Sequence, residues 1–141
     1  MGLDQYLFSC EHDEVLEGIW ADLYEKYPND LKEPEEGYER DYVTLLRDRL
    51  LVGEWRKHAN LQEYIETMYG VPEEVNCRYV ELSEPTIHKI IRLSKEHNLP
   101  HGEGFFWGET EPQQNEDTVE IMEKALEEMG KGRRIFYYAW Y

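Results

Sequence analysis

The sequence lacks the features that mark several large classes of protein. No window holds the roughly 18 apolar residues that a membrane span needs. The start MGLDQYLFSC has neither the basic flank nor the long apolar run of a signal peptide. Cys10 and Cys77 are the only cysteines, so neither a disulfide framework nor a zinc site with paired cysteines is expected. We therefore expect a cytoplasmic protein that makes no membrane contact.

The sequence also lacks the common enzyme motifs. It has no phosphate-binding glycine loop of the Walker or Rossmann kind, no nucleophile-elbow serine and no alternating acidic loop for calcium. His97 and His101 are four residues apart, but Pro100 breaks the helix that would place both rings on one face. We expect no metal site and no cofactor.

Basic residues are scarce. Fifteen Lys and Arg residues face thirty-one Asp and Glu residues, which gives a formal net charge of −16. This charge repels nucleic-acid backbones and favours a protein partner with a basic surface. The acidic residues gather in residues 11–41 and 109–128. They form either solvated helix faces or a surface that imitates nucleic acid, and charge alone does not separate these two alternatives.

Strand and helix patterns alternate along a chain of 141 residues, which is the size of a single domain. The patterns predict strands over residues 2–9, 77–82 and 133–141, where β-branched and aromatic residues are frequent. Apolar residues at helical spacing predict helices over residues 13–27, 55–69, 83–98 and 116–129. Residues 28–41 form an exposed acidic loop, and the segment from Tyr42 is either a helix interrupted by Gly53 or a strand through YVTLL. The predicted fold is α+β, with a small, mostly antiparallel sheet of about three strands covered by about four helices.

The segment WRKH, residues 55–58, is the first candidate binding site. On the predicted helix it places the side chains of Trp55, Arg56, Lys57 and His58 within one turn. Cations are unfavourable at a helix N-terminus because the helix dipole is positive there. Salt bridges to nearby acids would offset this cost, and so would the capture of an anionic ligand or a carboxylate of a partner.

The second candidate is the segment GEGFFWGE, residues 102–109. It holds three large rings between two glycines, together with a carboxylate: Glu103, Phe105, Phe106 and Trp107. The glycines allow backbone turns that other residues resist, so alternate rings could point into the core or out of it. The rings are either core packing or a contact surface for a base or a partner protein.

Four stretches of this chain are similar to a family of small phage and prophage-encoded proteins. They are MGLDQYLF at the start, EWRKHANLQEYI, LPHGEGFFWGE, and IMEKAL followed by the aromatic C-terminal segment. Members of the family begin MGLDMYL, carry a Trp-Arg-Lys helix start and share a GFFFG loop. Here Gln5, Glu54 and Trp107 depart from that pattern. The resemblance implies a phage protein acting in the host cytoplasm, and it implies no activity.

Three functions remain open. The first is non-enzymatic binding of a host or defence-system protein, or of a small anionic, nucleotide-like ligand, through WRKH and the aromatic segment. The second is a small hydrolase that uses His58 or His101 with a carboxylate such as Glu103. The third is a structural protein whose tyrosines lie in a homo-oligomer interface.

Overall fold

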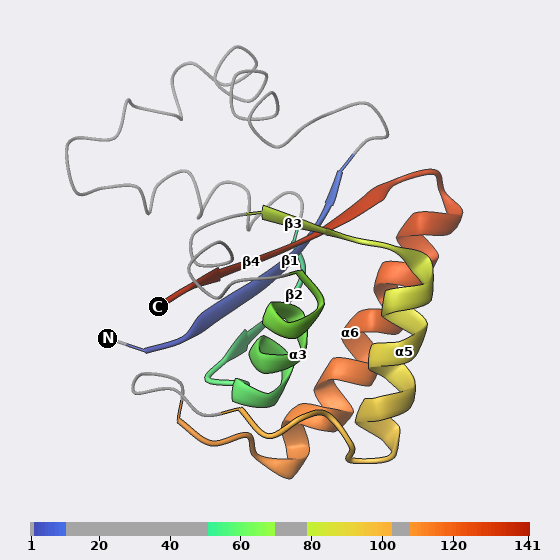
Figure 1. Cartoon of the computed structure of the whole chain (residues 1–141). Coiled ribbons are helices and arrows are strands. Elements are labelled where there is room, and N and C mark those ends of the chain that lie inside the picture. Colours follow the sequence, from blue (N-terminus) through green and yellow to red (C-terminus); the bar gives the residue numbers. More distant parts are fainter. Residues whose placement is uncertain (1, 11–50, 70–78, 103–107) are drawn as a thin grey trace, which may run out of the picture.

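A computed structural model describes residues 2–10, 51–69, 79–102 and 108–141, which form an antiparallel sheet with helices on one face (Figure 1). The strands are β1 (Asp4–Cys10), β2 (Leu51–Arg56), β3 (Tyr79–Leu82) and β4 (Arg134–Trp140), in the order β2-β1-β4-β3. The helices are α3 (Ala59–Tyr69), α5 (Glu84–Lys95) and α6 (Pro112–Gly130). The predicted α+β class and the antiparallel sheet are confirmed, with one strand more than expected. The helix predicted over 13–27, the loop over 28–41 and the segment 42–50 lie outside the described residues.

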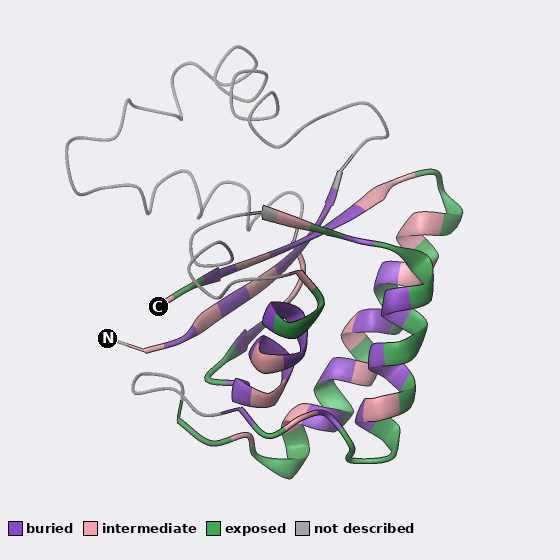
Figure 2. Ribbon diagram, viewed as in Figure 1, coloured by how far each residue is buried: buried purple, intermediate pink, exposed green. Residues whose placement is uncertain are grey.

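Alternation along β1 and β4 divides the sheet into two faces. Leu7 of β1 pairs with Tyr137 of β4 on the face that meets the helices. Phe8 and Phe136 pair on the opposite face, and both are also buried. Buried segments accordingly run along the strands and along the inner sides of the helices, while the outer sides of the helices are exposed (Figure 2).

The α5 helix begins as its sequence predicts. The Oγ atom of Ser83 accepts a hydrogen bond from the Thr86 N–H at 3.4 Å, and Pro85 lies in the first turn, where its missing N–H is not needed. Ile87, Ile90 and Ile91 are buried in the core. This N-cap fixes where the helix starts and therefore which side faces the sheet.

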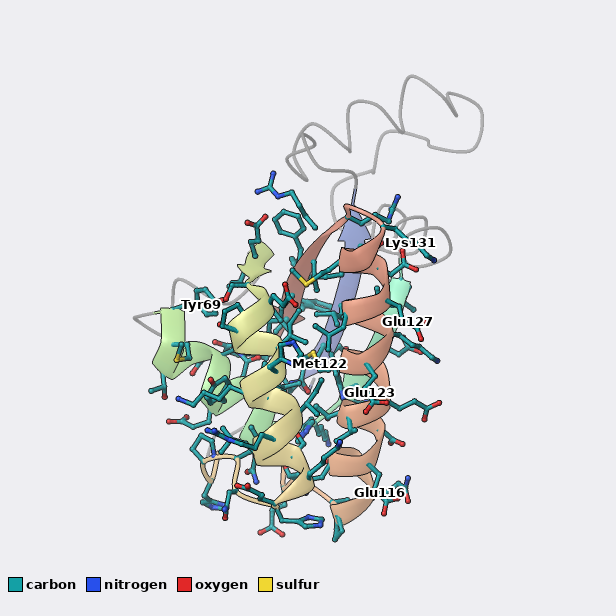
Figure 3. All side chains as sticks on the ribbon, turned by 90° about the vertical axis from the view of Figure 1, so that its right-hand side faces the viewer. Tyr69, Glu116, Met122, Glu123, Glu127 and Lys131 are labelled. Carbon is teal, nitrogen blue, oxygen red and sulfur yellow. The ribbon has the colours of Figure 1, made fainter. Side chains whose placement is uncertain are left out.

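The α6 helix begins four residues before its predicted start at Glu116. Pro112 occupies the first turn. The Glu111 N–H donates to Oε1 of Gln114 at 2.8 Å, and the Gln114 N–H donates to the Glu111 carbonyl at 2.9 Å. Met122 points toward the core, and Glu116, Glu123 and Glu127 lie along the outer side (Figure 3). These outer acids are part of a solvated helix face.

Strand β2 was not predicted, because Gly53 was interpreted as a residue that interrupts a helix. Gly53 lies on the helix-facing side of the sheet, opposite Leu7. A Cβ atom at this position would lie 2.5 Å from Cγ2 of Ile121 in α6. The glycine therefore permits close approach of helix and strand rather than interrupting a helix.

The prediction that WRKH opens a helix is wrong. Trp55 and Arg56 are the last residues of β2, and Lys57 adopts a left-handed conformation with φ of 57°. His58 precedes the first residue of α3, and its carbonyl accepts the first helical bond from the Gln62 N–H. Both cations therefore precede α3 and do not lie in its first turn.

Candidate functional site

The turn at residues 56–60 contacts both described ends of the aromatic segment. The Gly102 N–H donates to the Asn60 Oδ1 at 2.9 Å. At the other end, a Cβ atom on Gly108 would lie 3.2 Å from Cδ of Lys57, so the lysine stem runs over this glycine. Glu103, Phe105, Phe106 and Trp107 lie outside the described residues. The two segments singled out in the sequence are therefore neighbours in space where the structure describes them.

Thr110 joins this turn to the start of α3. Its Oγ1 atom accepts a bond from the Asn60 N–H at 2.9 Å and lies 3.1 Å from the Nδ1 atom of His58. The Asn60 N–H is one of the donors that a helix N-terminus leaves without an internal partner. Thr110 thus caps the helix from a segment fifty residues away in sequence.

His58 is fully buried at this junction. Burial lowers the pKa of its imidazole to about 4, and the nearby negative charge of Asp117 opposes that effect in part. The Nε2 atom has no hydrogen-bond partner in the described part of the chain. The ring is therefore neutral at physiological pH and acts as a packed, hydrogen-bonded residue of the turn.

Trp55 belongs to the core rather than to an exposed surface. Its side chain is buried, and its Nε1–H donates to the Oγ1 atom of Thr118 in α6 at 2.9 Å. The Thr118 hydroxyl in turn donates to the carbonyl of Gln114. Trp55 was predicted to be a binding residue, but its indole is enclosed between the sheet and α6.

Arg56 and Lys57 are both exposed. The side chain of Arg56 is 74% exposed, and its Nε atom lies 4.0 Å from the Oδ1 atom of Asp4, which is the outer limit for an ion pair. In the described part of the chain, no carboxylate pairs with Lys57. Both cations thus present their charge to solvent.

The sheet register places an exposed tryptophan in the same row as Arg56, two strands away. Asp4 pairs with Arg56 on one side and with Trp140 on the other, so Arg56, Asp4 and Trp140 form one row across three strands. We call it the Trp140 row. It lies on the face away from the helices, and neighbouring strands are ~4.8 Å apart, which places the outer two residues about 10 Å from each other. Trp140 is 45% exposed.

Aromatic rings support the Trp140 row from the next positions along the strands. Tyr6 and Tyr138 pair across β1 and β4, with ring centroids 6.5 Å apart, and Tyr6 stacks on Phe8 at 6.0 Å. Sequence reasoning did not identify Trp140. The alternation of Phe136, Tyr138 and Trp140 along the last strand was the signal that could have found it.

Two further histidines of the described part have polar partners. His88 lies 3.6 Å from Glu84 on the exposed side of α5, and His97 contacts the Asn115 amide at 3.0 Å. Among the described residues, no group of three or more His, Cys, Asp or Glu residues could hold a metal ion. Within the same residues, no helix combines the length and the apolar character needed to cross a bilayer.

Comparisons of the chain with protein-family models, with curated proteins and with solved structures found no match.

Proposed function

We propose that this protein acts by non-enzymatic binding of a partner protein, and that the Trp140 row together with Lys57 forms its contact surface. The observation that carries this proposal is the position of an exposed Arg and an exposed Trp on one face of the sheet. Trp, Tyr and Arg are the residues that contribute most to protein-protein binding. A partner would place an anionic group between Arg56 and Lys57 and an apolar group against the indole of Trp140.

Charge supports a protein partner at longer range. A net charge of −16 attracts a protein whose surface is basic overall and speeds their encounter. Surface charges act over about 8 Å at physiological ionic strength, so the bases of the turn govern only the local contact. From the resemblance to phage-encoded proteins, we propose that the partner is a host or defence-system protein.

A comparison of variants by affinity capture from host lysate tests this proposal. The wild type is compared with Arg56→Ala/Lys57→Ala and with Trp140→Ala. Truncation of a residue central to an interface costs about 2 kcal/mol or more, so each variant should retain its partner ~30-fold less strongly. The matched control is Lys89→Ala/Arg92→Ala, which removes the same charge from the exposed side of α5, across the sheet.

Loss of the same captured protein in both site variants, with retention in the control, supports the proposal. Equal capture by all four proteins would show that the surface lies elsewhere. Inorganic phosphate and adenosine monophosphate are then added to the wild type. If either compound binds and releases the captured protein, the small anionic ligand is the better description of what this surface recognises.

A further inference from the structure

A chain of hydrogen bonds runs through the interior between the sheet and α3. It links Gln5 of β1, Tyr137 of β4, and Gln62 and Glu66 of α3, all of which are buried. Tyr141, which follows β4 and is half-buried, lies at the outer end of the chain. Buried polar side chains are costly unless each finds a partner, so the direction of every bond can be traced.

The inner half of the chain has a fixed direction because it starts at a backbone donor. The His58 N–H can only donate, and it donates to Oε1 of Gln5 at 2.8 Å. The Nε2 atom of Gln5 must then be the donating end of the amide, and it donates to the His58 carbonyl at 3.1 Å and to the Tyr137 hydroxyl at 2.9 Å. Since Tyr137 accepts this bond, its own proton goes to Oε1 of Gln62.

The outer half of the chain ends on one carboxylate oxygen. Because Oε1 of Gln62 accepts, its Nε2 donates, and it donates to Oε1 of Glu66 at 3.1 Å. The Tyr141 hydroxyl donates to the same oxygen at 2.6 Å. The network therefore holds the Glu66 carboxylate in one orientation, with Oε1 as the acceptor of both bonds.

The Glu66 carboxylate has no counter-ion in the described part of the chain. Glu66 is only 4% exposed, none of the ion pairs between described residues includes it, and both of its hydrogen bonds from described residues reach Oε1. Glu63, one turn earlier, adds a further acidic group. A buried carboxylate supported only by neutral donors is an unusual and costly arrangement.

The position of Glu66 on its helix adds to the negative potential. Glu66 lies in the last turn of α3, where the helix dipole is negative and where cationic residues are favourable, yet this turn contains no basic residue. The neighbouring surface is accessible, since Thr67 and Met68 are exposed and Met68 is 47% exposed. The end of α3 therefore attracts a cation that the described chain does not itself supply.

We propose that Glu66 is a recognition site for a cationic group, such as a Lys or Arg side chain of a partner or a small organic amine. The cation approaches past Tyr141 and bonds to the Oε2 atom, while the internal chain keeps Oε1 in place. This site lies on the helix-covered face, opposite to the Trp140 row, so it does not depend on the proposed function. The Glu66 proposal and the proposed function can therefore fail independently of each other.

The direct test is a titration followed by NMR. Wild-type protein labelled with ¹⁵N is titrated with n-butylammonium chloride and with ethylguanidinium chloride at constant ionic strength, and sodium chloride serves as the salt control. Saturable shifts are expected at the side-chain amide of Gln62, which bonds directly to Glu66. Chemical-shift changes that do not saturate, or that occur at residues distant from this amide and from Tyr141, would overturn the proposal. This result needs only the wild-type protein.

Two isosteric variants then locate the charge that binds. Glu66→Gln keeps an acceptor for Gln62 and Tyr141 but removes the charge, and it should weaken cation binding by about tenfold or more, as for loss of a charge-assisted hydrogen bond. Glu63→Gln removes the same charge one turn away and should bind within about twofold of wild type. Equal affinity of Glu66→Gln and wild type would reject Glu66 as the site.

Discussion

Removal of a single hydroxyl at Tyr137 tests the directed hydrogen-bond chain. In the Tyr137→Phe variant, Oε1 of Gln62 becomes a buried acceptor without a described partner, and Gln5 keeps only its bonds to His58. A buried polar group without a partner costs ~1–3 kcal/mol, and a lost buried hydrogen bond costs about 1 kcal/mol. We therefore expect the free energy of unfolding to fall by about 2–4 kcal/mol. At roughly 4 °C per kcal/mol for a chain of this size, the midpoint of thermal unfolding should fall by about 10 °C.

Chemical denaturation of matched tyrosine variants provides the measurement. Tyr69→Phe is the control, because its hydroxyl donates to the Glu81 carbonyl at an exposed position and its loss should cost less than about 1 kcal/mol. In a double-mutant cycle with Gln62→Leu, Tyr137→Phe should cost less than it does alone, since the orphaned acceptor is gone. If the Tyr137→Phe and Tyr69→Phe variants are equally stable, the hydrogen-bond chain contributes no stability and the assigned directions of its bonds are wrong.

Two further predictions concern burial at single positions. The pKa of His58 falls from 6.5 to about 4 on folding, so between these pH values the unfolded chain binds a proton that the folded chain excludes. The free energy of unfolding should therefore decrease by about 3 kcal/mol as pH falls through this window. His58→Gln should lose that part of the pH dependence in denaturant titrations, and an unchanged slope would contradict a buried neutral ring. Gly53→Ala places a Cβ atom 2.5 Å from Ile121 and should lower stability by about 1–3 kcal/mol; calorimetry should show partial recovery with Ile121→Ala, and a Gly53→Ala protein as stable as wild type would refute the close approach.

Sequence patterns predicted the elements whose signals are local. Ser83 and Pro85 marked the start of α5, and short segments rich in aromatic and β-branched residues marked β1 and β4. These signals depend on residues within one turn or one strand, so no knowledge of the tertiary fold was needed.

The missed features depend on contacts between distant segments. Gly53 resembled a helix breaker because nothing in the nearby sequence shows that Ile121 packs against it. Trp55 was chosen as a binding residue because it adjoins two cations, but alternation along a strand places its side chain on the face opposite to Arg56. Trp140 became a candidate only when the register placed it in one row with Arg56.

Side chains occupy one carbonyl on each edge strand of the described sheet, and this limits how the protein can bind another chain. In the β2–β1 pair, the bond from the Lys57 N–H to the Leu3 carbonyl means that the backbone groups of Arg56 point away from β1. The side chain of Gln114 donates to the outward carbonyl of Arg56 at 2.8 Å.

At the opposite edge, the Tyr69 hydroxyl donates to the carbonyl of Glu81 in β3 at 2.9 Å. Side chains that occupy edge carbonyls prevent a further strand from pairing there. Addition of a strand from a partner, or of an edge from a second copy of this chain, would first have to break these bonds. A contact made by side chains, as proposed for the Trp140 row and for Glu66, leaves both of these bonds intact, and for this reason we favour face-to-face binding over extension of the sheet.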